Sequence, residues 1–300
     1  MLLVPLKPNL RHPSFFRRKS ASPTATMATL STYWDSINDK IDGHLKAAVP
    51  VRKPLSVFEP LHHLTLAAPR SSAPALCIAA CELVGGSSSQ AMDAAAALHL
   101  IHASLSVHKR LYRGGSGSGF GSNIELLTGD GMLPLAFELL ANSEGAGDES
   151  RSRRILRVIV EISKAAGSEG LLKGEYNELQ LGRLAGFTGG DWRDAFWMDH
   201  VCGKKEGGLH ACAAACGGIL GGGTEEEIEK LRKLGYLVGM IRGIVSVKGG
   251  AAGEDEEWMK VVEEMAETAL KLLTGFSGEL KSKITNICQY EDLFPLIKSY

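Results

Sequence analysis

Apolar residues recur along most of the chain with the three-to-four-residue spacing of amphipathic helices, whereas the alternation typical of strands is rare. The stretch 88–111 is almost entirely apolar and rich in alanine, which indicates a helix packed on several sides. The pattern predicts an all-α protein, a single domain of about ten helices around one long central pair. Predicted helices cover 33–48, 75–84, 88–111, 124–140, 155–167, 192–217, 224–247 and 279–290, and a further helix begins at 254–257.

Two acidic runs are interpreted as helix starts and not as metal sites. Thr224 can accept a hydrogen bond from the backbone amide of Glu227, whose carboxylate can reach back, as in a capping box. The run Glu-Asp-Glu-Glu at 254–257 complements the positive end of a helix dipole. The glycine-rich segment 114–121 follows a helix and fits no phosphate-binding motif, so a flexible connector is predicted there.

Three glycines recur at intervals of four residues within the predicted helix 224–247. Gly235, Gly239 and Gly243 therefore share one helix face. Each costs about 1 kcal/mol relative to alanine in a helix interior, so their alignment requires a reason. Either another helix approaches closely at this face, or a ligand position has been vacated, and the sequence leaves both explanations open.

The first thirty residues differ in composition from the rest of the chain. They contain Lys, Arg, Ser, Thr and Pro but no acidic residue, and they lack the continuous apolar core of a secretory signal. This composition is typical of an organelle transit peptide, with a disordered basic tail as the alternative. The chain is therefore divided into a transit peptide at 1–30 and a helical domain at 31–300.

The overall charge gives little information about partners. The formal net charge is −1, so nothing favours nucleic acid or an anionic membrane as a ligand. The best candidate for a membrane span, 234–247, is shorter than the roughly 18 residues required and contains Arg242.

Four of the six cysteines form two pairs with the same spacing, Cys77 with Cys81 and Cys212 with Cys216. Six cysteines in a chain of this length do not make a disulfide framework. On a helix this spacing points both thiols to one face, where a strain-free bridge between them is improbable. Zinc sites prefer the shorter C-x-x-C spacing, so no metal site is predicted and the thiols are expected to be free.

Four sequence blocks resemble plant plastid prenyl diphosphate synthases. They are CIAACELVGG at 77–86, LHLIHASLSVHKRL at 98–111, LTGDGMLPLAFELL at 127–140 and CAAACGGILGGGTEEEIEKLRKLG at 212–235. The blocks occur in the family's order and span most of residues 50–250. The resemblance implies an isoprenoid-synthase-like bundle of helices around a central cavity.

Catalytic members of the family carry two aspartate-rich motifs that bind Mg²⁺ and the allylic diphosphate, because metal ions held by carboxylates stabilise the charge of the leaving group. Where the resemblance places the first motif, this chain has Lys109 and Arg110, and no acid occurs between Asp93 and Glu125. Cations at these positions, with Arg113 one turn on, oppose a divalent metal by direct repulsion.

The other diphosphate-binding positions are altered as well. In the second motif, Arg242 and Gly243 replace the aspartate pair, Ser246 replaces the third aspartate and Gly239 replaces a glutamine. Of the three cations that normally bind isopentenyl diphosphate, only Arg70 remains. The retained family positions are Asp130 and Lys205.

This pattern resembles the small, regulatory subunit of heterodimeric geranyl or geranylgeranyl diphosphate synthases. The resemblance implies a non-catalytic plastid protein without a cofactor of its own, with Mg²⁺ bound only by the catalytic large subunit. It also implies that the two Cys-x-x-x-Cys motifs recruit that large subunit, which then changes in activity or product length. The alternatives are an active prenyltransferase with a rearranged metal site, or a helical scaffold for another partner.

Overall fold

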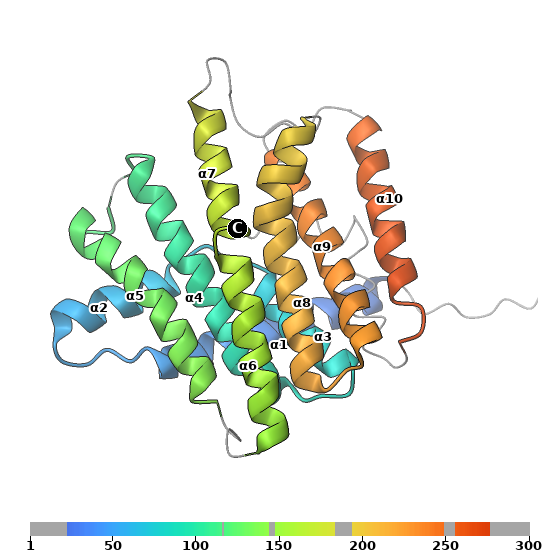
Figure 1. The fold of residues 1–300 in the computed structure, drawn as a ribbon, viewed down its shortest axis with the longest axis horizontal. Coiled ribbons are helices and arrows are strands. Elements are labelled where there is room, and N and C mark those ends of the chain that lie inside the picture. Colours follow the sequence, from blue (N-terminus) through green and yellow to red (C-terminus); the bar gives the residue numbers. More distant parts are fainter. Residues whose placement is uncertain (1–22, 116, 144–147, 184–193, 249–255, 277–300) are drawn as a thin grey trace, which may run out of the picture.

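The computed structural model of the protein describes residues 23–115, 117–143, 148–183, 194–248 and 256–276. Within these ranges every regular secondary-structure element is a helix, as the hydrophobic pattern predicts (Figure 1). In chain order they are α1 (Pro23–Ala48), α2 (Leu55–Leu66), α3 (Ala73–Leu83), α4 (Ser88–Tyr112), α5 (Ser122–Ala141), α6 (Glu149–Ala166), α7 (Leu171–Gly182), the π-helix η1 (Trp197–Gly207), α8 (Gly208–Gly221), α9 (Glu225–Lys248) and α10 (Glu256–Leu272). None of the described helices has the length and apolar character needed to cross a bilayer.

Helix α8 lies at the centre of the bundle. It packs against α3 and α9 most extensively, and also against α4 and α6 (Figure 1). Nearly every residue of α3 and α8 is buried, and most of them are Ala, Gly or Cys. Small side chains let neighbouring helices approach closely, so this composition explains how one helix can be covered on all sides.

The glycines of α9 lie where neighbouring helices approach α9 closely. A Cβ atom at Gly235 would lie 2.2 Å from the carbonyl oxygen of His210, and one at Gly239 would lie 2.2 Å from that of Glu206. The same feature recurs between α8 and α3, where a Cβ atom at Gly217 would lie 2.1 Å from the carbonyl oxygen of Cys77. Of the two explanations left open by the sequence, close packing is therefore the one that the structure supports.

The predicted helices agree with α3, α4, α5, α6 and α9 to within a few residues at most ends. The capping box is present, since the Thr224 amide donates to Glu227 Oε2 at 2.7 Å and the Glu227 amide donates to Thr224 Oγ1 at 3.3 Å. Two helices were not predicted: α2, which tolerates Pro60 in its interior, and α7.

Some predicted boundaries fall outside the described residues or differ from the structure. α1 begins at Pro23, ten residues earlier than predicted, and so overlaps the end of the assigned transit peptide, which itself stays a prediction. The predicted helix 192–217 consists of η1 followed by α8 in its described part. Residues 1–22, the predicted helix 279–290 and positions 254–255 of the acidic run lie outside the described residues.

Candidate functional site

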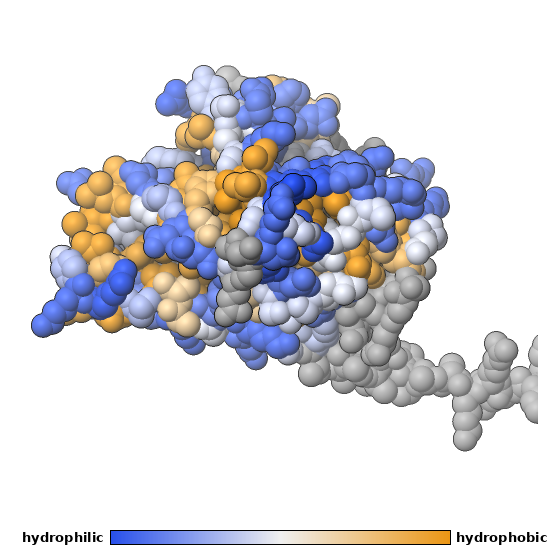
Figure 2. Space-filling model, turned by 60° about the horizontal axis from the view of Figure 1, so that its bottom comes forward, coloured by the Kyte–Doolittle hydropathy of each residue, from blue (hydrophilic) through white to orange (hydrophobic). Residues whose placement is uncertain are grey.

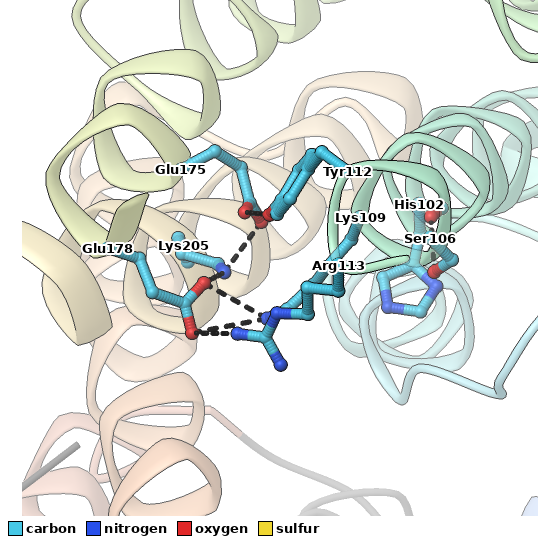
Figure 3. Close-up of polar contacts among 8 residues, drawn as sticks. All are labelled: His102, Ser106, Lys109, Tyr112, Arg113, Glu175, Glu178 and Lys205. Carbon is cyan, nitrogen blue, oxygen red and sulfur yellow. Dashed lines mark hydrogen bonds and ion pairs between the residues drawn. The ribbon is translucent and has the colours of Figure 1, made fainter. Parts of the chain in front are cut away.

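The cations at the end of α4 project toward α7 and η1. Lys109, Tyr112 and Arg113 are three and four residues apart and therefore share one face of α4. Glu175 and Glu178 share a face of α7 for the same reason. Figure 3 shows these side chains converging with Lys205 of η1, and the six residues are called the ionic cluster below.

Glu178 is the centre of the ionic cluster. It accepts hydrogen bonds from Lys109 Nζ, at 3.2 and 3.0 Å to its two oxygens, and from Lys205 Nζ at 2.5 Å. Arg113 Nη2 donates to it at 3.1 Å. One carboxylate of α7 therefore binds three cations, which come from two other helices.

Glu175 forms the second half of the ionic cluster. Lys205 Nζ lies 2.6 Å from Glu175 Oε1, and the Tyr112 hydroxyl donates to Glu175 Oε2 at 2.7 Å. The side chains of Lys205 and Glu175 are only 13 % and 10 % exposed, so this ion pair is shielded from solvent.

Burial and charge act in opposite directions on these groups. Burial alone would raise the pKa of Glu178, but Lys205 and then Lys109 hold it well below its ordinary value. Burial favours the neutral amine of Lys205, but Glu175 and Glu178 raise its pKa. The pKa of Lys109 is lowered by burial and by the charge of Lys205, because two ammonium groups share one carboxylate.

Arg110 points to a different place and does not join the ionic cluster. Its Nη2 donates to Glu125 Oε2 at 2.6 Å, and the amide and hydroxyl of Ser118 donate to Glu125 Oε1 at 2.6 and 2.8 Å. Burial opposes ionisation of Glu125, but these donors lower its pKa. The segment predicted as a flexible connector is thus fixed at Ser118 by a buried carboxylate.

The cations of α4 are paired with acids that lie elsewhere in the sequence. The acids come from α7 and from the start of α5, outside the interval between Asp93 and Glu125 that contains none. Glu175 and Glu178 were missed because α7 was not predicted. Their spacing of three residues in LLKGEYNELQ was the signal that could have identified them.

The ionic cluster does not suit a divalent metal. Its two carboxylates are already neutralised by ammonium and guanidinium groups, which carry no ligand atom for a cation. Within the described part of the chain, no group of three or more His, Cys, Asp or Glu residues is arranged to hold a metal ion.

The positions at which the resemblance places the second motif lie on α9. A Cβ atom at Gly243 would lie 2.3 Å from Cys202 Sγ, so an aspartate at this position would require at least the Cys202 side chain to move. Ser246 is exposed, and Arg242 is partly buried.

The remaining family positions are not brought to the ionic cluster, Lys205 excepted. Arg70 donates to Asp42 of α1 at 2.7 Å in an exposed pair. Asp130 lies 3.1 Å from His108 Nε2.

All four cysteines of the two motifs are buried between α3 and α8. Cys77, Cys81 and Cys216 have no exposed surface, and Cys212 is 3 % exposed. Burial raises the pKa of the Cys81 thiol to about 12, so it stays protonated at neutral pH. The thiols therefore do not reach the surface of this chain, and any role in recruiting a partner would be exerted through the packing of α3 on α8.

Replacing Cys77 and Cys81 together by alanine should leave the affinity for a large subunit within about twofold, because small residues are retained and no surface atom changes. Titration of the partner by isothermal calorimetry, with the near-ultraviolet circular dichroism of both chains as a folding control, measures the effect. Loss of binding by a normally folded variant would show that the thiols themselves are required.

Known proteins resemble this chain over most of its length. No protein-family model matches it. The heterodimeric geranylgeranyl pyrophosphate synthase small subunit 2, chloroplastic, of Cannabis sativa is 41 % identical over 264 residues, which is 86 % of this chain and 90 % of that protein. The chain belongs to the small subunits of heterodimeric geranylgeranyl pyrophosphate synthases. The chloroplast location of this relative agrees with the plastid location predicted for the chain.

Solved structures place the small subunit in the same fold. A chain of the mint heterotetrameric geranyl pyrophosphate synthase, a deletion mutant in complex with ligands, is 44 % identical with a TM-score of 0.77, covering 86 % of this chain and all of that one. The geranyl diphosphate synthase small subunit of Antirrhinum majus is 44 % identical with a TM-score of 0.75, covering 86 % and 98 %. The isoprenoid-synthase-like, all-α fold implied by the sequence resemblance is confirmed.

Proposed function

We propose that this chain is a non-catalytic regulatory subunit that binds the large subunit of a plastid geranylgeranyl diphosphate synthase and changes its activity or product length. The observation that carries the proposal is the ionic cluster. Lys109, which stands where the resemblance places an aspartate, is bound to Glu178 together with Lys205. A site whose carboxylates are neutralised internally has no free charge with which to hold Mg²⁺ and a diphosphate.

The proposed docking surface is an apolar face on the neighbouring helices α5 and α6. Figure 2 shows apolar side chains gathered on the side of the molecule where Figure 1 places α2 and α5. Leu127 of α5 and Leu156 of α6 are 66 % and 62 % exposed. The α5–α6 surface comprises Ile124 and Leu127, which share a face of α5, together with Leu156 and Val160, which share a face of α6. Exposed apolar groups on two adjacent helices are typical of a protein–protein interface.

Prenyl transfer by the chain without residues 1–30, in the presence of Mg²⁺, tests the proposal. We expect no turnover by this chain alone, and a changed rate or product length when it is mixed with a plastid large subunit. Turnover by this chain alone would contradict the non-catalytic assignment. Formation of no complex, with no effect on the large subunit, would contradict the regulatory role.

The variant Lys109→Asp with Arg110→Asp should remain without turnover. Restoring two acids at the end of α4 does not rebuild the second motif, where Gly243 is packed against Cys202. The two substitutions also remove one of the three cations that bind Glu178 and the cationic partner of the buried Glu125, so the free energy of unfolding should fall by about 2 kcal/mol or more. Assays of prenyl transfer and urea denaturation of the same preparation measure both effects, with Lys173→Asp at an exposed ion pair as the control.

A further inference from the structure

Helix α7 is weakly anchored by apolar packing. Only Leu171, Gly174 and Glu175 of its twelve residues are buried, whereas Leu172 and Tyr176 are each 59 % exposed. Among the described elements it packs mainly on η1 and slightly on α6. In Figure 1 it stands at the upper end of the bundle, beyond the body formed by α3, α4 and α8. Apolar burial alone therefore leaves α7 with little to hold it against α4.

Long polar side chains supply the connection that apolar packing does not. Lys109 and Arg113 reach from α4 to Glu178, and Tyr112 reaches to Glu175. Lys205 joins both carboxylates to η1 and packs its aliphatic stem against Gly174, where a Cβ atom would lie 2.6 Å from Lys205 Cγ. The ionic cluster thus joins three helices that meet at the end of α4.

We infer that the ion pairs of the ionic cluster keep α7 docked on α4 and η1 without any metal ion. The proposal is distinct from the proposed function, because it concerns how this chain holds its own helices together and not what it does to a partner. It follows from a disagreement between the residues present and the metal site that the resemblance implies. At the end of α4, cations fixed to the chain occupy the place where the resembled enzymes bind Mg²⁺, and these cations are always present.

Two properties of the ionic cluster follow if charges hold α7 in place. Its strength depends on ionic strength, since the partly exposed contacts of Lys109 and Arg113 are screened by salt. It is indifferent to Mg²⁺, because both carboxylates are already paired, and to inorganic diphosphate, because the three cations are already bound to those carboxylates. An enzyme-like site that bound metal would show the opposite dependence.

Hydrogen–deuterium exchange of the full chain, followed by mass spectrometry of peptides covering 171–182, tests the inference. In Glu178→Gln we expect amide exchange in α7 to become about tenfold faster, while peptides of α3 and α8 keep their protection. The matched control is Glu169→Gln, which removes an exposed ion pair with Lys173 at the start of the same helix and should change exchange by less than about twofold. Addition of MgCl₂ with inorganic diphosphate should leave exchange of the wild-type chain unchanged.

A second arm uses the wild-type chain and does not depend on a variant folding correctly. Raising the salt concentration to about 1 M, where the screening length is about 3 Å, should accelerate exchange in α7 selectively. Unchanged exchange of α7 in both Glu178→Gln and high salt would overturn the inference. Stronger protection of α7 on addition of Mg²⁺ would also overturn the inference, since that result requires a metal site at the ionic cluster.

Discussion

Gly239→Ala should lower the free energy of unfolding by about 3 kcal/mol, and with it the thermal midpoint by about 6 to 12 °C. The added methyl group would lie 2.2 Å from the carbonyl oxygen of Glu206 and 2.9 Å from the Cα atom of Gly207. Both are backbone atoms, so no side chain can rotate away to relieve the overlap. The two helices α9 and η1 would have to separate, which also loosens the packing of Trp197 and Ile241 between them.

The matched control is Gly43→Ala in α1. Gly43 is exposed, and a Cβ atom at this position meets nothing within 4 Å. Alanine there should raise the free energy of unfolding by about 0.5 to 1 kcal/mol, because it favours the helix and restricts the unfolded chain. Urea denaturation monitored by circular dichroism measures both variants. Equal effects of the two substitutions would show that the close approach of α9 and η1 is not what the glycine serves.

The same close approach explains why glycine stands at positions 239 and 243. The resemblance implies a glutamine at position 239 and an aspartate at 243. Neither side chain fits between α9 and η1 as they are packed here, since a Cβ atom at Gly239 would lie 2.2 Å from the carbonyl oxygen of Glu206 and one at Gly243 would lie 2.3 Å from Cys202 Sγ. Glycine at both positions and the close packing of α9 on η1 therefore depend on each other.

The long helices could be predicted from the sequence because their apolar pattern is set by a core that surrounds them. α4 is apolar over almost its whole length, and the cap at Thr224 before α9 is a local signal that needs no tertiary information. Helix α7 could not be predicted in the same way. Its exposed Leu172 and Tyr176 blur the apolar stripe, and it is held in place by charges from α4 and η1 that lie 60 or more and about 30 residues away in the chain, respectively.

The candidate site shows the same division. The resemblance pointed to Lys109, Arg110 and Lys205, but it gave no indication of their carboxylate partners. Those partners are a consequence of the tertiary fold, which brings α7 and the start of α5 to the end of α4. The direction in which each cation points could not be predicted from the sequence either, since Lys109 and Arg110 are adjacent in sequence and bind different acids.

Leu127→Asp combined with Leu156→Asp should weaken binding of a large subunit by at least about 100-fold, or roughly 2.7 kcal/mol. Burying the α5–α6 surface in an interface would remove the two leucines from water. An aspartate at either position would instead have to be dehydrated without a partner of opposite charge. Because both leucines are exposed in the chain alone, the substitutions should leave its own stability almost unchanged.

Leu172→Asp is the control for this variant. Leu172 is 59 % exposed, close to the 66 % of Leu127 and the 62 % of Leu156, but it lies on α7, away from the α5–α6 surface. Leu172→Asp should change the affinity by less than about threefold. Comparison with the double variant then separates the effect of where the charge is placed from the effect of losing an exposed leucine. Affinities from calorimetric titration and masses from analytical ultracentrifugation then give a direct comparison. Equal binding by both variants would place the docking surface elsewhere. Selective loss in the double variant would identify α5 and α6 as the surface through which this small subunit binds a large subunit.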